Sequence, residues 1–248
     1  SAAGYIRLRE QDEWKILPGG KYFLTRNMSS VVAFGVGEKY EPGKGFHIIG
    51  AHTDSPCPKL KPVSALSKGG FLGVGVQTYG GGLWHTWFDR DLSVAGKVVL
   101  RRSASGGCLS QELVRIDRPI LRIPTLAIHL DRNVNTEGFK LNAETHLAPI
   151  LSTAIKGDLE IEVAQKTVGN KAGQGTENRN DAPVAHHPLL LALLAEQLDC
   201  NAHEIIDFDL QVCDVQPSVI GGAACEFIFS GRLDNLASSF CALKALLE

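Results

Sequence analysis

The 248-residue chain lacks the sequence features of membrane, secreted and nucleic-acid-binding proteins. Its longest apolar stretch, residues 189–195, is too short to cross a bilayer. The first ten residues, SAAGYIRLRE, lack the basic-then-apolar order of a signal peptide. The net charge is −2, and the basic residues are scattered rather than gathered in a nucleic-acid footprint. We therefore expect a globular protein that binds neither membranes nor nucleic acid.

The cysteine pattern also excludes several classes of protein. The six cysteines form no C-x-x-C pair and show no regular spacing, unlike zinc fingers and disulfide frameworks. We interpret them as free, mostly buried thiols of a reducing compartment, and this predicts a cytoplasmic location. Cys57 lies near His52 and could be a soft metal ligand or a nucleophile, but its flanking prolines favour a structural role.

The stretch FHIIGAHTDSP, residues 46–56, joins an apolar run to a cluster of polar groups. The run 46–51 has no polar alternation, which is typical of a strand covered on both faces in an α/β sheet. Ligands of such sheets bind beyond the carboxyl ends of the strands, where His52 and Asp54 follow. Residues two apart on an extended chain face the same side. His52 could be a metal ligand that the Asp54 carboxylate orients, or the two residues could form a His-Asp pair for base catalysis. Alternatively, Asp54 and Ser55 merely cap a turn that His52 lines.

A second polar group follows an apolar run near the end of the chain. The sequence CEFIFSGRLDN predicts a strand that ends near Ser230, then a turn, then a helix from about Asn235. Asp234 therefore lies where a strand gives way to a helix, either at a ligand-binding sheet edge or as a simple N-cap. The apolar stripe of this predicted amphipathic helix consists of Leu236, Phe240, Ala242, Leu243 and Leu246.

Between about Pro58 and Gly221 the sequence changes character. Short β-like runs at 70–82, 92–102, 119–130 and 157–165 are separated by Gly and Pro, which predicts a mainly β module. A polar segment near 165–184 has almost no large apolar residue and predicts a mobile loop. A helix is expected from about Pro188 and a strand over 205–215.

Four long blocks together resemble the aspartyl aminopeptidases of the aminopeptidase I family of dinuclear zinc exopeptidases. They are GAHTDSP at 50–56, TYGGGLWHTWFDRDLSVAGKVVL at 78–100, PILRIPTLAIHLDR at 119–132 and EFIFSGRLDNLASSFCALKALL at 226–247. The resemblance implies an α/β fold, in which a zinc-exopeptidase-like catalytic domain is interrupted by a β-rich dimerisation domain. The corresponding division is 1–58 and 222–248 for the catalytic domain and 59–221 for the insert. It also implies a pair of zinc ions, peptide substrates with N-terminal Asp or Glu, and dimers that assemble into a tetrahedral dodecamer.

The same resemblance assigns roles to particular residues. His52 is implied to bind one zinc, and Asp234 to bridge both ions. Asp54 is implied to fix the ring of His52 and to tune its basicity. His129 is implied to bind substrate in the active site of the neighbouring subunit, although a histidine in an apolar run is by itself more often a packed core residue.

The chain departs from the family pattern in its catalytic groups. The family uses an adjacent Glu-Glu pair after the block around Asp234, as base and zinc ligand, and this sequence contains no such pair. A further Asp, a C-terminal His and the basic group that would meet an acidic substrate are also expected beyond Glu248. We therefore expect a piece of a longer enzyme, trimmed at its amino end too, that hydrolyses little or nothing alone.

Two rival functions are kept. The chain could be a non-enzymatic assembly or scaffold module, which the missing ligands favour. It could also be a hydrolase that uses Ser55 with His52 and Asp54 as a triad. Residues so close along one strand do not converge as nucleophile, base and orienter, and no G-x-S-x-G elbow is present.

Overall fold

The computed structural model describes residues 3–102, 106–156 and 185–248, and it divides into two compact units. The first unit combines Ser1–Ser55 with Arg232–Glu248, and the second spans Pro56–Gly231. The two segments of the first unit thus come from opposite ends of the chain. The functional roles predicted for 1–58, 59–221 and 222–248 stay predictions.

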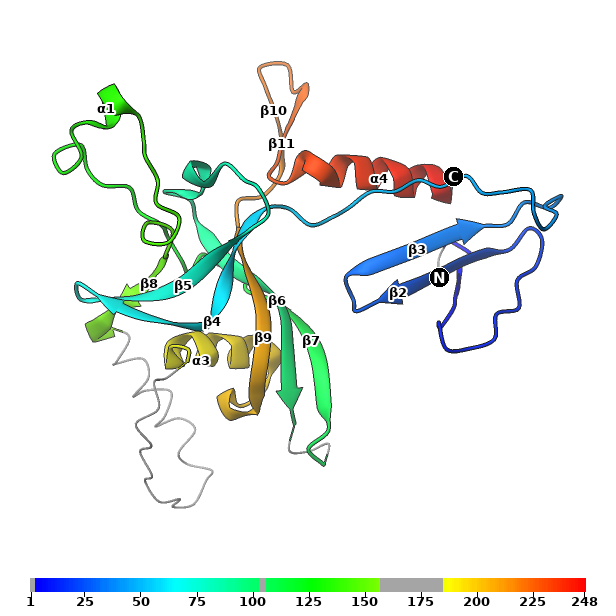
Figure 1. Ribbon diagram of the computed structural model, residues 1–248, viewed down its shortest axis with the longest axis horizontal. Helices are drawn as coiled ribbons and strands as arrows, with labels where there is room; N and C mark the ends of the chain where they lie inside the picture. Colours follow the sequence, from blue (N-terminus) through cyan, green and yellow to red (C-terminus); the bar gives the residue numbers. More distant parts are fainter. Residues whose placement is uncertain (1–2, 103–105, 157–184) are drawn as a thin grey trace. The chain divides into compact units, whose positions relative to one another are not determined.

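The second unit contains a six-stranded sheet in the order β7-β6-β9-β4-β5-β8, with every neighbouring pair antiparallel (Figure 1). Alternation explains how these strands form: in β5, Leu72, Val74 and Val76 are buried at every second position. The β runs expected at 70–82 and 92–102 and the strand expected over 205–215 are confirmed as β5, β6 and β9. The strands are β4 (Cys57–Lys68), β5 (Phe71–Tyr79), β6 (Leu92–Arg101), β7 (Leu109–Arg115), β8 (Ile150–Thr153) and β9 (Ile205–Asp214).

One helix, α3 (Pro188–Leu198), packs against this sheet. Pro188 occupies its first turn, where the missing N–H costs no hydrogen bond, and Asp199 ends it in the left-handed conformation. Leu190, Leu194 and Leu198 are spaced by four residues and are buried in the same core as the inward side chains of β6 and β9. The helix predicted from about Pro188 is confirmed.

Two predicted β-like runs have a different outcome. Residues 119–130 form no strand; they make only isolated bridges, Leu121 to Leu92 and Arg122 to Ile150. The apolar pattern there is therefore a connection that touches two strands, and the strand prediction is wrong. The predicted β-like run at 157–165 and the predicted mobile loop near 165–184 both lie outside the described residues. The remaining elements of the second unit are η1 (Trp84–Trp87), α1 (Val134–Glu137), η3 (Ala202–Glu204), β10 (Val219–Gly221) and β11 (Phe227–Phe229).

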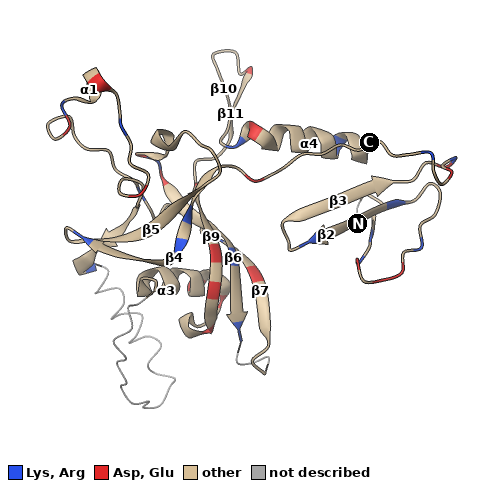
Figure 2. Ribbon diagram, viewed as in Figure 1, with Lys and Arg blue, Asp and Glu red and all other residues tan. Residues whose placement is uncertain are grey.

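Charged residues occur along several strands of the sheet (Figure 2). Acidic residues gather on β9, where Asp207, Asp209 and Asp214 lie. Lys59 of β4 pairs with Asp209 at 2.8 Å, and its ammonium lies 5.6 Å from the ring of Tyr79. The ion pair ties β4 to β9, which share few backbone pairs, and the contact with Tyr79 ties β4 to β5.

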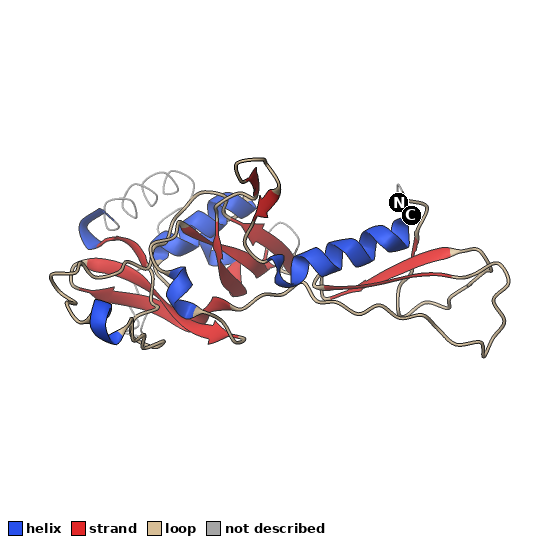
Figure 3. Ribbon diagram, turned by 90° about the horizontal axis from the view of Figure 1, so that it is seen from above, coloured by secondary structure: helices blue, strands red, loops and turns tan. Residues whose placement is uncertain are grey.

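The first unit contains a small sheet and a helix. The strands β1 (Ile6–Arg7), β2 (Lys21–Arg26) and β3 (Ser30–Gly35) pair in that order. The sequence pattern predicts strands at 22–25 and 31–36, and β2 and β3 confirm them. The helix α4 (Leu233–Leu247) is irregular at Asp234 and Asn235 and continues as one helix beyond them (Figure 3). The Tyr5 hydroxyl donates a 2.8 Å hydrogen bond to the carbonyl of Leu246. None of the helices in the described ranges has the length and apolar character needed to traverse a bilayer.

The predicted buried strand at 46–51 is wrong. The segment has no regular structure, and Phe46, Ile48 and Ile49 are 82%, 85% and 71% exposed. No strand among the described residues pairs with it, so nothing supplies the two covering layers that its apolar pattern requires. The helix α4 likewise has no buried residue, and Phe240 is 65% exposed.

The expectation of mostly buried thiols is also wrong. Cys57 is buried at the start of β4, whereas Cys108, Cys225 and Cys241 are exposed. Cys108 lies in the connection directly before β7, and Cys225 lies between β10 and β11. Cys241 lies on α4, which buries no side chain. No disulfide joins cysteines in the part of the chain that is described.

Candidate functional site

His52 and Asp54 face one another in the extended segment that follows residues 46–51. The Nδ1 atom of His52 lies 3.2 Å from Oδ1 of Asp54 and 3.0 Å from the Asp54 carbonyl oxygen. Both side chains are 59% exposed. The offset of two residues thus produces the predicted contact, and a protonated Nδ1 donating to Asp54 leaves Nε2 directed away from it as a lone-pair donor.

Asp234 lies at an irregular position between a strand and a helix. The strand β11 ends at Phe229, and the body of α4 begins only after Asp234 and Asn235, whose backbone angles are not helical. The peptide bond between these two residues is cis. The residue before α4 is Arg232, whose side chain makes no capping hydrogen bond, and the alternative that Asp234 or Asn235 is only an N-cap stays a prediction.

Two serine hydroxyls tie the segment 52–55 to the start of α4. The Ser55 hydroxyl donates to the carbonyl of Asp234 at 3.2 Å, across 179 positions of sequence. The Ser239 hydroxyl donates to the carbonyl of His52 at 2.8 Å, across 187 positions. The backbones that bear His52 and Asp234 therefore lie side by side within one unit.

The side chains of His52 and Asp234 are of types that bind zinc, but two ligands are fewer than a zinc site needs. An imidazole nitrogen and a carboxylate are normal zinc ligands, and a carboxylate on the other imidazole nitrogen is the usual orienting partner. A catalytic zinc takes about three protein ligands and a water. Within the described ranges, no group of three or more His, Cys, Asp or Glu side chains is placed to hold a metal ion. The metal-ligand roles of His52 and Asp234 and the orienting role of Asp54 stay predictions.

The arrangement does not support a serine triad. Ser55 directs its hydroxyl to the backbone of Asp234, and within the described ranges no hydrogen bond joins it to His52. A nucleophilic serine needs its base within hydrogen-bond reach. The geometry thus gives Ser55 a role in holding α4 against the segment 52–55.

His129 lies in the second unit, on an exposed connection. Every residue from 124 to 130 is exposed, and the local turn is closed by the Leu130 N–H, which donates to the Ala127 carbonyl at 2.8 Å. The alternative that His129 is a packed core residue is therefore wrong. Its role in a neighbouring subunit stays a prediction.

Sequence reasoning assigned no role to the charged run Asp89-Arg90-Asp91, yet both acids bond to the connection 122–125 and the arginine bonds to β9. Asp89 accepts hydrogen bonds from both the backbone N–H (3.2 Å) and the hydroxyl of Thr125. Arg90 pairs with Asp214 at 2.5 Å, and Asp91 pairs with Arg122 at 2.9 Å. The signal in the sequence was three alternating charges directly before a buried strand.

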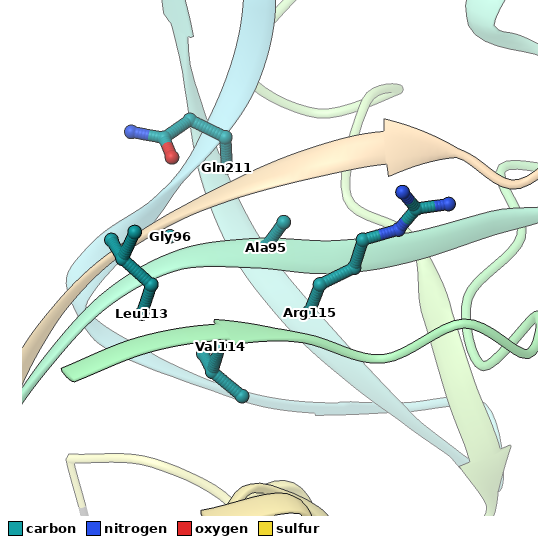
Figure 4. A pocket seen from close by; sticks show the side chains of 6 residues that line it. All are labelled: Ala95, Gly96, Leu113, Val114, Arg115 and Gln211. Atoms are coloured by element: carbon teal, nitrogen blue, oxygen red, sulfur yellow. The ribbon is translucent and has the colours of Figure 1, made fainter. Parts of the chain in front are cut away.

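A shallow pocket on the sheet face is a weaker candidate. It has a volume of about 440 Å³ and lies over β6, β7 and β9 (Figure 4). Arg115 is its one charged lining residue, and it pairs with Asp117 at 2.8 Å. The lining offers no base, nucleophile or metal-ligand group, since it consists of Ala95, Gly96, Leu113, Val114, Arg115 and Gln211.

The sequence and the fold of the chain both match proteins of one family. The chain is 58% identical to a probable aspartyl aminopeptidase of Ricinus communis, over 99% of this chain and 51% of that protein. The solved structure of the Ape4 and Nbr1 complex matches with 44% identity and a TM-score of 0.85, over 99% of this chain and 45% of that chain. The S. cerevisiae mApe1 dodecamer matches with 28% identity and a TM-score of 0.73, over 99% of this chain and 49% of that chain.

Two findings follow from this comparison. The chain spans about half the length of the relatives it matches. Its mixed α/β fold is shared with the solved structures, and the predicted resemblance is confirmed. The family model of the aminopeptidase I zinc metalloproteases matches residues 1–248, so the chain belongs to this M18 family, which includes the aspartyl aminopeptidases.

Proposed function

We propose that this chain is the N-terminal half of a zinc aminopeptidase that releases Asp or Glu from the amino end of peptides. The family membership and the names of the relatives support this substrate class. The central supporting observation is the pair of serine hydrogen bonds that brings the backbone of His52 next to that of Asp234. Such an approach of two distant segments is what a shared metal site requires.

Each residue at this place has a distinct proposed role. His52 would supply a neutral imidazole nitrogen to one zinc, and Asp234 would supply carboxylate oxygens to both ions. Asp54 holds Nδ1 of His52, which fixes the tautomer and the orientation of the ring. Bound zinc would lower the pKa of a water molecule and polarise the peptide carbonyl.

The rest of the proposed active site lies outside these 248 residues. His52 and Asp234 are fewer donors than a catalytic zinc needs, and the chain spans about half of its relatives. The exposed apolar side chains at 46–49 and on α4 fit the same proposal, because the remainder of a catalytic α/β domain would cover them. The isolated chain is therefore proposed to be inactive.

The second unit is proposed to serve in assembly. Its sheet would form dimers that build a tetrahedral dodecamer, as the dodecameric mApe1 relative suggests. His129 would then reach the active site of a neighbouring subunit and bind its substrate. A cytoplasmic location is part of the same proposal.

The test uses the full-length protein with two substitutions, His52→Ala and Asp234→Ala. Each should reduce hydrolysis of an aspartyl peptide by at least about a hundredfold, because each removes a ligand from the site. Each should also lower the zinc content measured by mass spectrometry. The matched controls are His203→Ala and Asp117→Ala, at exposed positions of the second unit.

Full zinc content in both variants would refute the ligand assignment, even if activity fell. Loss of zinc and activity in the control variants would show that the effect is not specific to the site.

An assembly or scaffold module is the second candidate. The observation that favours it is the absence of a three-donor metal group within the described ranges. A full-length protein that assembles normally, binds no zinc and hydrolyses no peptide would support this candidate over the enzyme.

A further inference from the structure

The segment 124–146 forms a projection from the second unit. It is bounded by Ile123 and Leu147, which are both 0% exposed. Its base is closed by two backbone hydrogen bonds between Arg122 and Ile150, at 3.1 Å and 2.8 Å. His129 lies on the outgoing limb of this projection, four residues after Thr125.

Asp89 holds the outgoing limb. Its backbone N–H donates to the carbonyl of Ile123 at 2.8 Å, and its carboxylate accepts the N–H and the hydroxyl of Thr125. Among the described residues, this carboxylate is the one hydrogen-bond partner of segment 124–130 outside the projection. The path of the chain toward His129 is therefore set at Thr125 by a single side chain.

The residue before Asp89 holds the returning limb. The ring of Phe88 meets the ring of Phe139 edge to face, with 4.9 Å between centroids. The dipeptide Phe88-Asp89 is itself fixed, because its neighbours Arg90 and Asp91 are paired with Asp214 and Arg122. One short segment thus clamps both limbs of the projection.

We propose that Asp89 is a positioning residue for His129: it sets the geometry with which His129 meets a substrate bound in a second copy of this protein. The inference rests on the proposed function, since it assumes that His129 acts in catalysis. Segment 124–130 buries none of its side chains, so packing does not fix its conformation. The hydrogen bonds from Thr125 to Asp89 therefore limit the motion of this segment relative to the sheet.

The experiment is a double-mutant cycle in the full-length protein, with Asp89→Gly and His129→Ala. Glycine tolerates the backbone angle of Asp89, whose φ is 56°, so Asp89→Gly removes the carboxylate without backbone strain. A misplacement of about 1 Å costs up to roughly a hundredfold, so kcat/KM should fall by about tenfold to a hundredfold in Asp89→Gly. In the His129→Ala background the same substitution should cost less than about twofold, because Asp89 acts through His129.

Asp89→Asn serves as the conservative rescue, because asparagine also tolerates a positive φ and keeps one acceptor for Thr125. Its activity should lie between those of wild type and Asp89→Gly. Asp117→Asn is the control for removing an exposed acid from the same unit, and it should have wild-type activity. An equal loss in both backgrounds, or no loss in Asp89→Gly, would overturn the inference. Wild-type activity in His129→Ala would overturn it as well.

Amide hydrogen exchange tests the clamp without reference to activity. In Asp89→Gly, residues 124–132 should exchange at least about tenfold faster, while the amides of β6 keep their protection. Unchanged exchange in 124–132 would refute the clamp. If the wild-type protein proved unable to hydrolyse acidic peptides, the proposed function would fail while this readout still decided whether Asp89 holds the projection.

Discussion

At the scale of single residues, the contact between Ser64 and His186 shows how burial changes acid–base behaviour. The Ser64 hydroxyl is buried and lies 2.8 Å from Nδ1 of His186, whose ring contacts that of Phe208 at a tilt of 42° with 4.3 Å between centroids. Burial lowers the pKa of His186, and the nearby charge of Asp207 opposes this effect. The neutral ring is therefore the form that the fold favours.

This lowered pKa predicts an acid-sensitive contribution to stability. Because the pKa of His186 is lower in the folded than in the unfolded chain, protons bind the unfolded chain first as the pH falls below about 6.5. Stability should fall from that pH down to the folded pKa and then level off. Urea unfolding at pH 7.5 and pH 5 measures the difference. His186→Asn should flatten it, His203→Asn at an exposed position should not, and an unchanged slope in His186→Asn would contradict the prediction.

Asp89, which we propose as a positioning residue, shows which contacts single-sequence reasoning misses. Its partner Thr125 is 36 positions away, and neither residue type is unusual in its local sequence. His52 and Asp54 could be singled out because their offset alone places them on one side of an extended chain. The Ser55 and Ser239 hydrogen bonds, by contrast, depend on the packing of α4 against the segment 52–55.

At the scale of elements, local patterns predicted those strands and helices whose partners lie within the chain. The helix α3 and the strands β5, β6 and β9 bury apolar side chains in one core, whereas β2 and β3 pair with each other and β3 buries no side chain. The run 46–51 has an equally apolar pattern but no pairing strand among the described residues. The run 119–130 fails for a different reason, because Asp89 and the isolated bridges hold it as a connection. A strand pattern thus identifies a segment that can pair, and the partner decides whether it does.

The packing of α3 predicts a large effect of a single leucine. Leu194 is 0% exposed and contributes to the core beneath the sheet. Leu194→Ala should lower the free energy of unfolding by about 2–5 kcal/mol, through lost burial and a remaining cavity. Leu113→Ala is the matched control, since Leu113 is 62% exposed, and it should cost less than about 0.5 kcal/mol. Equal costs in urea unfolding would show that α3 does not pack as described.

At the scale of the whole molecule, the first unit presents apolar side chains that nothing within the described residues covers. They belong to the segment 46–49 and to α4, where Phe240 is 65% exposed. Large exposed apolar patches are unusual in independent soluble domains, which fits the proposal that further residues cover these side chains. The family could be predicted because its motifs lie within these 248 residues, whereas the chain spans about half the length of its relatives and the described residues hold no group of three metal donors.

The isolated 248-residue chain should therefore lack activity and should expose apolar surface. Incubated with zinc and an aspartyl peptide, it should hydrolyse no more than the peptide does alone, while the full-length protein turns the peptide over. It should also bind a dye such as ANS more strongly per mole than the full-length protein. Turnover by the isolated chain at a rate within about tenfold of the full-length protein would contradict the proposal that the site needs further residues.

The most direct test of the central claim is anomalous diffraction at the zinc edge from crystals of the full-length protein. If His52 and Asp234 bind zinc, the peaks should lie within about 2.0–2.2 Å of an imidazole nitrogen of His52 and of a carboxylate oxygen of Asp234. Zinc peaks bonded to neither residue, or none in a protein that hydrolyses acidic peptides, would contradict it.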